Sequence, residues 1–124
     1  MFYDWRYVER VQVLELLKQV RDLFTDPNKW VDWPIAVNAF GQEVSPCDVQ
    51  TCVMWSLMGA IDMFSSHTHP KPLNGFVASA ARDYLDDLSD NKLFKEMLSY
   101  DDEFALICLA VEELEEEESN VGST

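Results

Sequence analysis

The stretch that most constrains the fold is the apolar-rich run from Ser45 to Phe64, SPCDVQTCVMWSLMGAIDMF. Ser45 suits the N-cap of a helix, Pro46 its first turn, and Asp48 the acidic position of a capping box. Apolar or small residues then recur at helical spacing, at Val49, Cys52, Val53, Ser56, Leu57, Ala60, Ile61 and Phe64. Because such residues cover so much of the circumference, the pattern predicts one central helix over residues 45–64.

Two small residues in that predicted helix, Gly59 and Ala60, form a notch in its apolar surface. A residue without a bulky side chain lets a neighbouring segment approach the helix closely. We therefore expect a packing partner at this notch. We also expect Trp55, Leu57 and Ile61 to be buried together with Ala60.

The composition supports one folded domain. A chain of 124 residues with 48% hydrophobic and 12% aromatic residues can bury a core without disulfides or metals. The last predicted helix ends in a run of glutamates, and acidic residues at a helix C-terminus oppose the helix dipole. We expect a helical domain over residues 1–118 and a disordered polar tail over 119–124.

Apolar periodicity predicts further helices on both sides of the central one. Main helices are expected over about residues 4–24, 76–88 and 100–116, a short helix over 92–98, and N-caps at Asp4, Asn74 and Ser99. The predicted fold class is therefore all-α. It is a compact bundle of four main helices plus a short one, with an irregular Trp-rich connection.

Two stretches between these helices are predicted to be irregular. Residues 29–44 contain Trp30, Trp33 and the turn-forming Gly41. There we predict a loop held to the core by its aromatic side chains, and the alternatives are a short extended segment or hairpin arm and a binding loop. Residues 65–75 contain two prolines and a glycine, which argue against regular structure.

The charge is strongly acidic and unevenly distributed. Nine basic and 23 acidic residues give a formal net charge of −14. Residues 83–124 carry 14 of the acids and two basic residues, Lys92 and Lys95, so this third of the chain accounts for −12. Such a balance repels nucleic acid and anionic membranes. We expect no direct nucleic-acid or membrane binding, and a partner that is a basic host protein or a nucleic-acid-binding complex.

Acidic residues at helix starts or on a helix face are the best candidates for a recognition surface, because a folded helix holds them in place. They are Asp83, Asp86, Asp87, Asp90, Asp101, Asp102 and Glu103. Their carboxylates can stand in for nucleic-acid phosphates and bind a surface rich in Lys and Arg. The alternative is an ordinary solvated helix face.

Residues suited to metal binding or covalent catalysis are few. Cys47, Cys52, His67 and His69 form a C-x4-C and H-x-H set, but the two thiols diverge by about 140° on the predicted helix. Cys47 near a predicted helix N-terminus is the best nucleophile candidate, although the charge of Asp48 disfavours its thiolate. The carboxylate pairs lack the spacing of a calcium loop. We expect no metal, no cofactor and no enzymatic activity.

The cysteines and the N-terminus favour a cytoplasmic protein. Cys52 and Cys108 fall inside apolar runs and are predicted to be reduced core residues. The opening residues MFYDWRYVER lack the apolar region of a signal peptide, and no apolar run approaches the length of a membrane span.

Trp30, Gly41 and the run Trp55-Ser56-Leu57-Met58-Gly59-Ala60 follow one another in a characteristic order. On these residues the chain resembles an uncharacterised family of small helical domains from bacteria and their phages. In that family a tryptophan after the first helix and a glycine turn precede a helix with the pattern W-C-x-x-G-A. Ser56 replaces the cysteine, and Asp101-Asp102 lies where the family often has Asn-Asp. The resemblance implies a small helical fold and a bacterial or phage setting, hence the host cytoplasm for a phage protein, but no activity.

These features together favour non-enzymatic protein binding through an acidic surface. The sharper hypothesis is a phage or mobile-element inhibitor that mimics DNA and binds a basic, nucleic-acid-handling host defence protein. Two alternatives stay open. One is a small-ligand or enzyme module built on the aromatic region around Trp30, Trp33, Trp55 and His67, and the other is a homo-oligomeric structural protein, for instance a homodimer.

Overall fold

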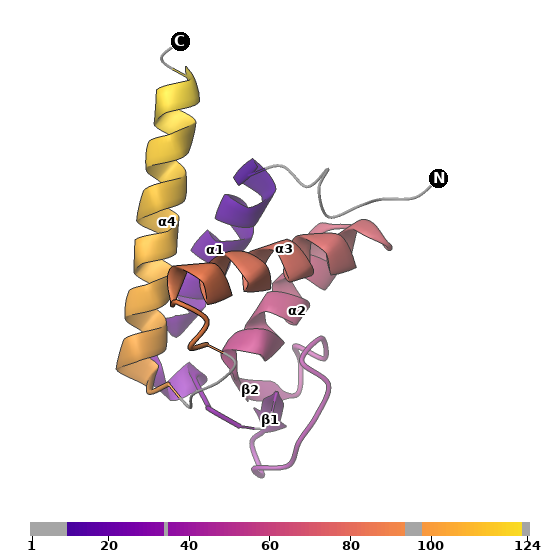
Figure 1. The fold of residues 1–124 in the computed structure, drawn as a ribbon. Helices are drawn as coiled ribbons and strands as arrows, with labels where there is room; N and C mark the ends of the chain where they lie inside the picture. The colour runs from indigo at the N-terminus through magenta and orange to yellow at the C-terminus, as the bar shows by residue number, and fades with distance from the viewer. Residues whose placement is uncertain (1–9, 34, 94–97, 123–124) are drawn as a thin grey trace.

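The structure, a computed structural model, describes residues 10–33, 35–93 and 98–122 of the chain. These residues form four α-helices, one short 3-10 helix and a two-stranded sheet (Figure 1). In chain order the elements are α1 (Arg10–Phe24), η2 (Pro27–Lys29), β1 (Ala36–Asn38), β2 (Cys52–Trp55), α2 (Leu57–Thr68), α3 (Leu73–Leu88) and α4 (Tyr100–Gly122). The mostly helical prediction is confirmed, and the small sheet is an addition that the all-α prediction lacked.

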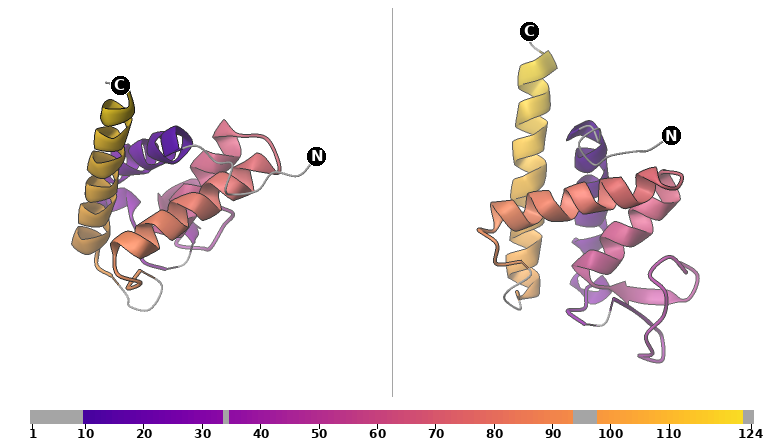
Figure 2. Two further views of the ribbon diagram at one scale, coloured as in Figure 1. Left: turned by 45° about the horizontal axis from the view of Figure 1, so that its top comes forward. Right: turned by 45° about the vertical axis from the view of Figure 1, so that its right-hand side comes forward.

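Helix α1 is the centre of the packing. It contacts α2, α3 and α4, whereas the Ser45–Phe64 run was predicted to supply the central helix. Figure 1 shows α4 beside α1, with α3 running across α1 to reach α4, and the right view of Figure 2 shows α3 in front of both helices. The α1 face that these neighbours cover consists of Val13, Leu14, Leu16, Leu17, Val20 and Phe24, all buried. Their spacing is that of one wide helical stripe, which is why α1 forms where the periodicity predicts it.

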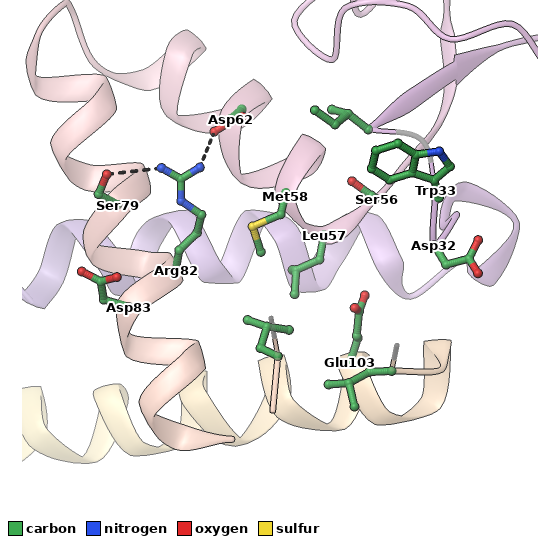
Figure 3. A pocket seen from close by; sticks show the side chains of 13 residues that line it. Asp32, Trp33, Ser56, Leu57, Met58, Asp62, Ser79, Arg82, Asp83 and Glu103 are labelled. Carbon is green, nitrogen blue, oxygen red and sulfur yellow. Dashed lines mark hydrogen bonds and ion pairs between the residues drawn. The ribbon is translucent and has the colours of Figure 1, made fainter. Parts of the chain in front are cut away.

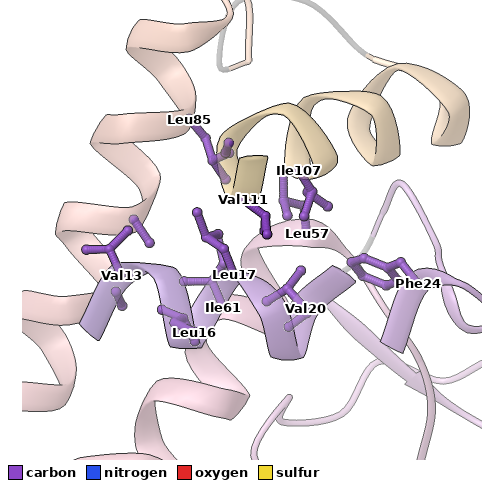
Figure 4. Packing of buried hydrophobic residues seen from close by; sticks show 14 of the residues in the cluster. Val13, Leu16, Leu17, Val20, Phe24, Leu57, Ile61, Leu85, Ile107 and Val111 are labelled. Atoms are coloured by element: carbon purple, nitrogen blue, oxygen red, sulfur yellow. The ribbon is translucent and has the colours of Figure 1, made fainter. Parts of the chain in front are cut away.

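All four helices and β2 contribute to one hydrophobic cluster (Figure 4). Leu17 of α1, Ile61 of α2, Leu85 of α3 and Ile107 of α4 are each fully buried in it. The predicted burial of Trp55, Leu57, Ala60 and Ile61 is confirmed. A single contiguous core of this kind makes the helices cooperate in folding.

The prediction of one helix over residues 45–64 is wrong in its first half. Residues 46–51 form turns, Cys52–Trp55 is the strand β2, and the helix α2 begins only at Leu57. Val49 and Val53, predicted on the buried face, are exposed. The cause is a pairing partner that local periodicity does not reveal: β2 pairs antiparallel with β1.

Ser56, rather than Ser45, is the N-cap of this helix. Its Oγ accepts a 3.1 Å hydrogen bond from the backbone N–H of Gly59. Its own N–H donates to the carbonyl of Ile35 at 2.8 Å, as a strand residue would. Ser56 therefore ends the strand and starts the helix, because a cap residue has extended backbone angles.

The predicted notch is confirmed at Gly59. The backbone of Ile35 lies so close that a methyl group at Gly59 would overlap the Ile35 carbonyl oxygen. Gly59 is buried for this reason, and no larger residue fits without moving the segment that leads into β1.

The hairpin alternative for residues 29–44 is correct for its middle part. Ala36 pairs with Trp55 and Val37 with Met54, with an irregularity after Val37. The predicted anchoring by aromatic side chains is confirmed at Trp30, whose indole N–H donates to Glu103 at 2.8 Å. These bonds fix the segment that leads from η2 to the sheet.

The ends of the other helices differ from the prediction in detail. Helix α3 begins at Leu73 after Pro72, rather than after an Asn74 cap, and α2 continues to Thr68, so the predicted 65–75 loop is much shorter. The Ser99 cap of α4 is confirmed by a 3.2 Å bond from the N–H of Asp102. Proline without an N–H is tolerated at a helix start, which explains the early start of α3.

Helix α4 continues to Gly122 instead of ending near Glu116, so the backbone at 119–122 is helical and does not match the predicted disordered tail. The cap at Asp4 and the middle of the predicted short helix over 92–98 lie outside the described residues. Within the described part of the chain, no helix has both the length and the apolar character to cross a membrane.

Candidate functional site

A cavity of about 720 Å³ lies between α2, α3, the start of α4 and the segment that precedes β1 (Figure 3). Leu57 and Met58 of α2 give it an apolar floor, and Ile35 lies beside them. Trp33 forms part of its wall. Pockets of about 300–1,000 Å³ are the usual size for bound small groups, so this one can hold a ligand or a partner side chain.

The charged groups that line the cavity are mostly acidic. Among the described residues they are the carboxylates of Asp32, Asp62, Asp83 and Glu103 and the guanidinium of Arg82. Cavity walls of low dielectric strengthen the field of such groups, so this arrangement attracts cations and repels anions.

Arg82 already interacts with two neighbouring side chains at the α2–α3 side of the cavity. Its guanidinium lies 3.6 Å from Asp62 and donates to the Ser79 hydroxyl at 3.2 Å, as the dashed lines in Figure 3 show. Burial raises the pKa of Asp62, and the positive charge of Arg82 partly offsets that rise. Within the described residues, no ion pair involves the other three carboxylates.

Glu103 projects from the first turn of α4 toward the cavity (Figure 3). Its Oε1 accepts the 2.8 Å bond from the Trp30 indole. Burial raises the pKa of this carboxyl, the bond from Trp30 lowers it, and the nearby charge of Asp32 raises it further. The charge of Asp32 therefore disfavours the charged form of Glu103, and a cation near both carboxylates would relieve that repulsion.

The three tryptophans of the predicted aromatic region have different roles. Trp55 is buried and its indole donates to the Pro46 carbonyl at 3.0 Å, while Trp30 is bound to Glu103. Trp33, in contrast, is 72% exposed and lies at the cavity. These residues do not form one open aromatic surface, and Trp33 alone is free to face a ligand.

The structure leaves five of the seven predicted site residues exposed, namely Asp83, Asp87, Asp90, Asp101 and Asp102. Asp86 is partly buried, and its Oδ1 has no hydrogen-bond partner among the described residues. Glu103 is also partly buried. Of the seven, Asp83 and Glu103 come together at the cavity, and the others lie outside it.

Several glutamates in the C-terminal half of α4 contact the neighbouring helices α1 and α3. Glu115 lies 3.9 Å from Lys18 and Glu117 lies 3.9 Å from Arg10, both on α1. The Tyr84 hydroxyl donates to Glu113 at 3.0 Å, and burial is the main reason that its pKa rises to about 12. Part of the acidic run therefore makes internal contacts with the neighbouring helices.

Among the described residues, the cysteines and histidines belong to no group of three or more side chains that could hold a metal ion. All three cysteines are free. The His67 ring lies 3.4 Å from the carbonyl oxygen of Cys47, and the Cys47 thiol lies 3.5 Å from the Ser66 hydroxyl. No helix begins at Cys47, so the helix field expected there is absent.

Sequence reasoning missed Asp32, Asp62 and Arg82 as site residues. They come from three separate segments, and each is unremarkable in its local pattern. The pair Asp32-Trp33, an acid followed by a tryptophan in the irregular connection, is a local signal that points toward this region.

Comparisons with protein-family models, curated proteins and solved structures found no match to this chain. The resemblance to small helical domains of bacteria and phages therefore stays a prediction.

Proposed function

We propose that the chain is a non-enzymatic protein-binding module that binds a basic partner through the acidic surface of α3 and the start of α4. One observation carries this proposal: the carboxylates of Asp83, Asp87, Asp101 and Asp102 are exposed on regular helices. Helices hold these charges at fixed positions, which a flexible acidic tail would not do. Fixed carboxylates attract a Lys- and Arg-rich surface and speed its association.

The internal ion pairs support a partner at this end of α4. Lys18 and Arg10 of α1 lie beside Glu115 and Glu117 at the other end of the helix. Within the described residues, no ion pair involves Asp83, Asp87, Asp101 or Asp102. Because no described residue forms an ion pair with these four, we propose that the partner supplies their positive charge.

In its sharper form, the proposal is that the chain inhibits a nucleic-acid-handling host protein by occupying its basic groove in place of DNA. The strongly negative charge supports this form, because a groove that binds phosphates also binds arrays of carboxylates. A phage or mobile-element origin and a cytoplasmic location belong to the same proposal. The acidic surface would repel nucleic acid itself, so the protein groove is the target.

The test is capture of partners from a bacterial lysate by the immobilised chain at low and high salt, with and without added DNA. The informative variant is Asp87→Lys/Asp101→Lys, since both residues are exposed. The matched control is Glu43→Lys/Asp48→Lys, which changes the charge equally at exposed positions between β1 and β2. Asp86 is left unchanged because it is partly buried.

We expect the immobilised chain to capture a basic nucleic-acid-binding protein. The amount captured should fall steeply as the salt concentration rises and when DNA is added. The Asp87→Lys/Asp101→Lys variant should no longer capture this protein, whereas the Glu43→Lys/Asp48→Lys control should still capture it. Capture that is unchanged by salt, by DNA and by the Asp87→Lys/Asp101→Lys substitutions would refute the proposal. Equal loss in both variants would show that net charge matters and this surface does not.

A further inference from the structure

We infer that the cavity between α2, α3 and α4 is a binding pocket for an arginine side chain, which lies against Trp33 and pairs with Asp32 and Glu103. The inference rests on the proposed function, since the arginine belongs to the basic partner. It adds a specific pocket to the exposed acidic surface.

The charges that line the cavity favour a cationic ligand. Asp32, Asp83 and Glu103 line it, and the cation present, Arg82, is held by Asp62 and Ser79. The carboxyl groups therefore exceed the positive charge of the described lining residues. An anionic ligand would meet net repulsion there, and a cationic ligand would be attracted.

Trp33 gives the cavity an aromatic wall. Trp33 is 72% exposed at the cavity, and a large apolar side chain left this open is a candidate contact for a partner. A guanidinium stacks on a tryptophan ring and still donates hydrogen bonds at its edge. The adjacent Asp32 and the nearby Glu103 offer acceptors for those bonds.

The floor of the cavity is apolar. Leu57 is buried and Met58 is partly buried beneath the cavity, between the Trp33 end and the Arg82 end (Figure 3). The methylene stem of an arginine packs well on such a surface while its charged head reaches polar groups. Lysine lacks the planar head that pairs with carboxylates in a bidentate way, so arginine fits this site better.

The experiment is a titration of the isotope-labelled chain with N-acetyl-arginine amide, followed by nuclear magnetic resonance. The probe is added up to about 20 mM, above the roughly millimolar dissociation constant expected for one side chain. N-acetyl-citrulline amide, which has the same shape without the charge, is the matched ligand. We expect the arginine probe to shift the Trp33 indole and the Leu57 and Met58 methyl signals, and the citrulline probe to leave them unchanged.

Two variants test the contacts. Trp33→Ala and Glu103→Gln should each weaken arginine binding about tenfold or more, whereas Phe40→Ala, at an exposed aromatic residue of the β1–β2 loop, should not. Circular dichroism melts of all three variants check that they fold. A Trp33→Ala variant that fails to fold would be replaced by Trp33→Gln for the same measurement.

The possible failures are distinguishable. No shift at the cavity with the arginine probe, an equal shift with citrulline, or full binding by the Trp33 and Glu103 variants would each overturn the pocket. If a nine-arginine peptide then still binds, and binding needs Asp87 and Asp101 but not Trp33, the exposed acidic surface stands without the pocket. If that peptide does not bind the wild-type chain, the proposed function fails as well.

Discussion

The indole N–H of Trp30 donates a 2.8 Å hydrogen bond to Oε1 of Glu103, and this bond joins the segment after η2 to the first turn of α4. Tyr100 reinforces the same junction. Its ring lies edge-on to Trp30 with the centroids 5.8 Å apart, and its hydroxyl donates to the carbonyl of Phe24 at the end of α1. Glu103 therefore has a structural contact and a cavity-facing charge at once.

Replacing that charge should stabilise the fold at neutral pH. The folded-state pKa of Glu103 is raised, mainly by burial, so the folded protein holds this proton more tightly than the unfolded chain does. The free energy of unfolding therefore falls as the pH rises from the ordinary pKa of glutamate toward the raised pKa of Glu103 in the folded protein. Glu103→Gln, which keeps an acceptor for Trp30, should melt higher than the wild type at about pH 7 and show little difference below about pH 4.

The control for this prediction is Asp101→Asn, an exposed acid in the same helical turn. It removes a favourable charge near the helix N-terminus and should cost about 0.3–1 kcal/mol at neutral pH. Thermal melts across pH give the comparison. A Glu103→Gln protein that is less stable than the wild type at neutral pH would show that the charged hydrogen bond outweighs the cost of burial.

Gly59→Ala should destabilise the protein by about 2 kcal/mol or more, because the added methyl group would overlap the Ile35 carbonyl. The matched control is Gly75→Ala in α3, where an added Cβ meets nothing within 4 Å. That change should be neutral or stabilise by up to about 1 kcal/mol through helix propensity. Denaturant unfolding measures both, and equal effects at the two glycines would contradict the close approach of Ile35.

Ala60→Asp should cost about 3 kcal/mol or more, since Ala60 is fully buried and a carboxylate there has no partner. The same substitution at Ala105, which is exposed on α4, should stay within about 1 kcal/mol. A cooperative melt of Ala60→Asp at the wild-type midpoint would argue against the packing of α2 in the core.

A chain that ends after Leu114 should keep its fold. It loses the pairs of Glu115 with Lys18 and Glu117 with Arg10, which are solvent-exposed and worth about 0.5 kcal/mol or less each. The melting midpoint should therefore move by only about a few degrees.

The control truncation ends before Val111. It removes Val111 and Leu114, both buried against the core, and should unfold the protein or lower its midpoint strongly. A large loss from the shorter truncation after Leu114 would show instead that the end of α4 contributes to stability beyond its ion pairs.

The helices and the core were largely predictable from the chain alone. Val13, Leu17 and Val20 of α1, and Ile107, Val111 and Leu114 of α4, recur at the spacing of one helix face, and that face is the buried one. The acidic character of α3 and α4 was equally visible. These features are local, because the side-chain period of a helix depends only on its own backbone geometry.

The strand β2 and the cavity, in contrast, could not be predicted from the sequence alone. Cys52–Trp55 fits a helical pattern as written, but its backbone pairs with Ala36–Asn38, and Ser56 then caps the helix that follows. The cavity gathers Asp32, Asp62, Arg82 and Glu103 from four separate segments. Strand pairing and cavity walls are contacts between residues distant in sequence, so no local pattern encodes them and packing alone brings them together.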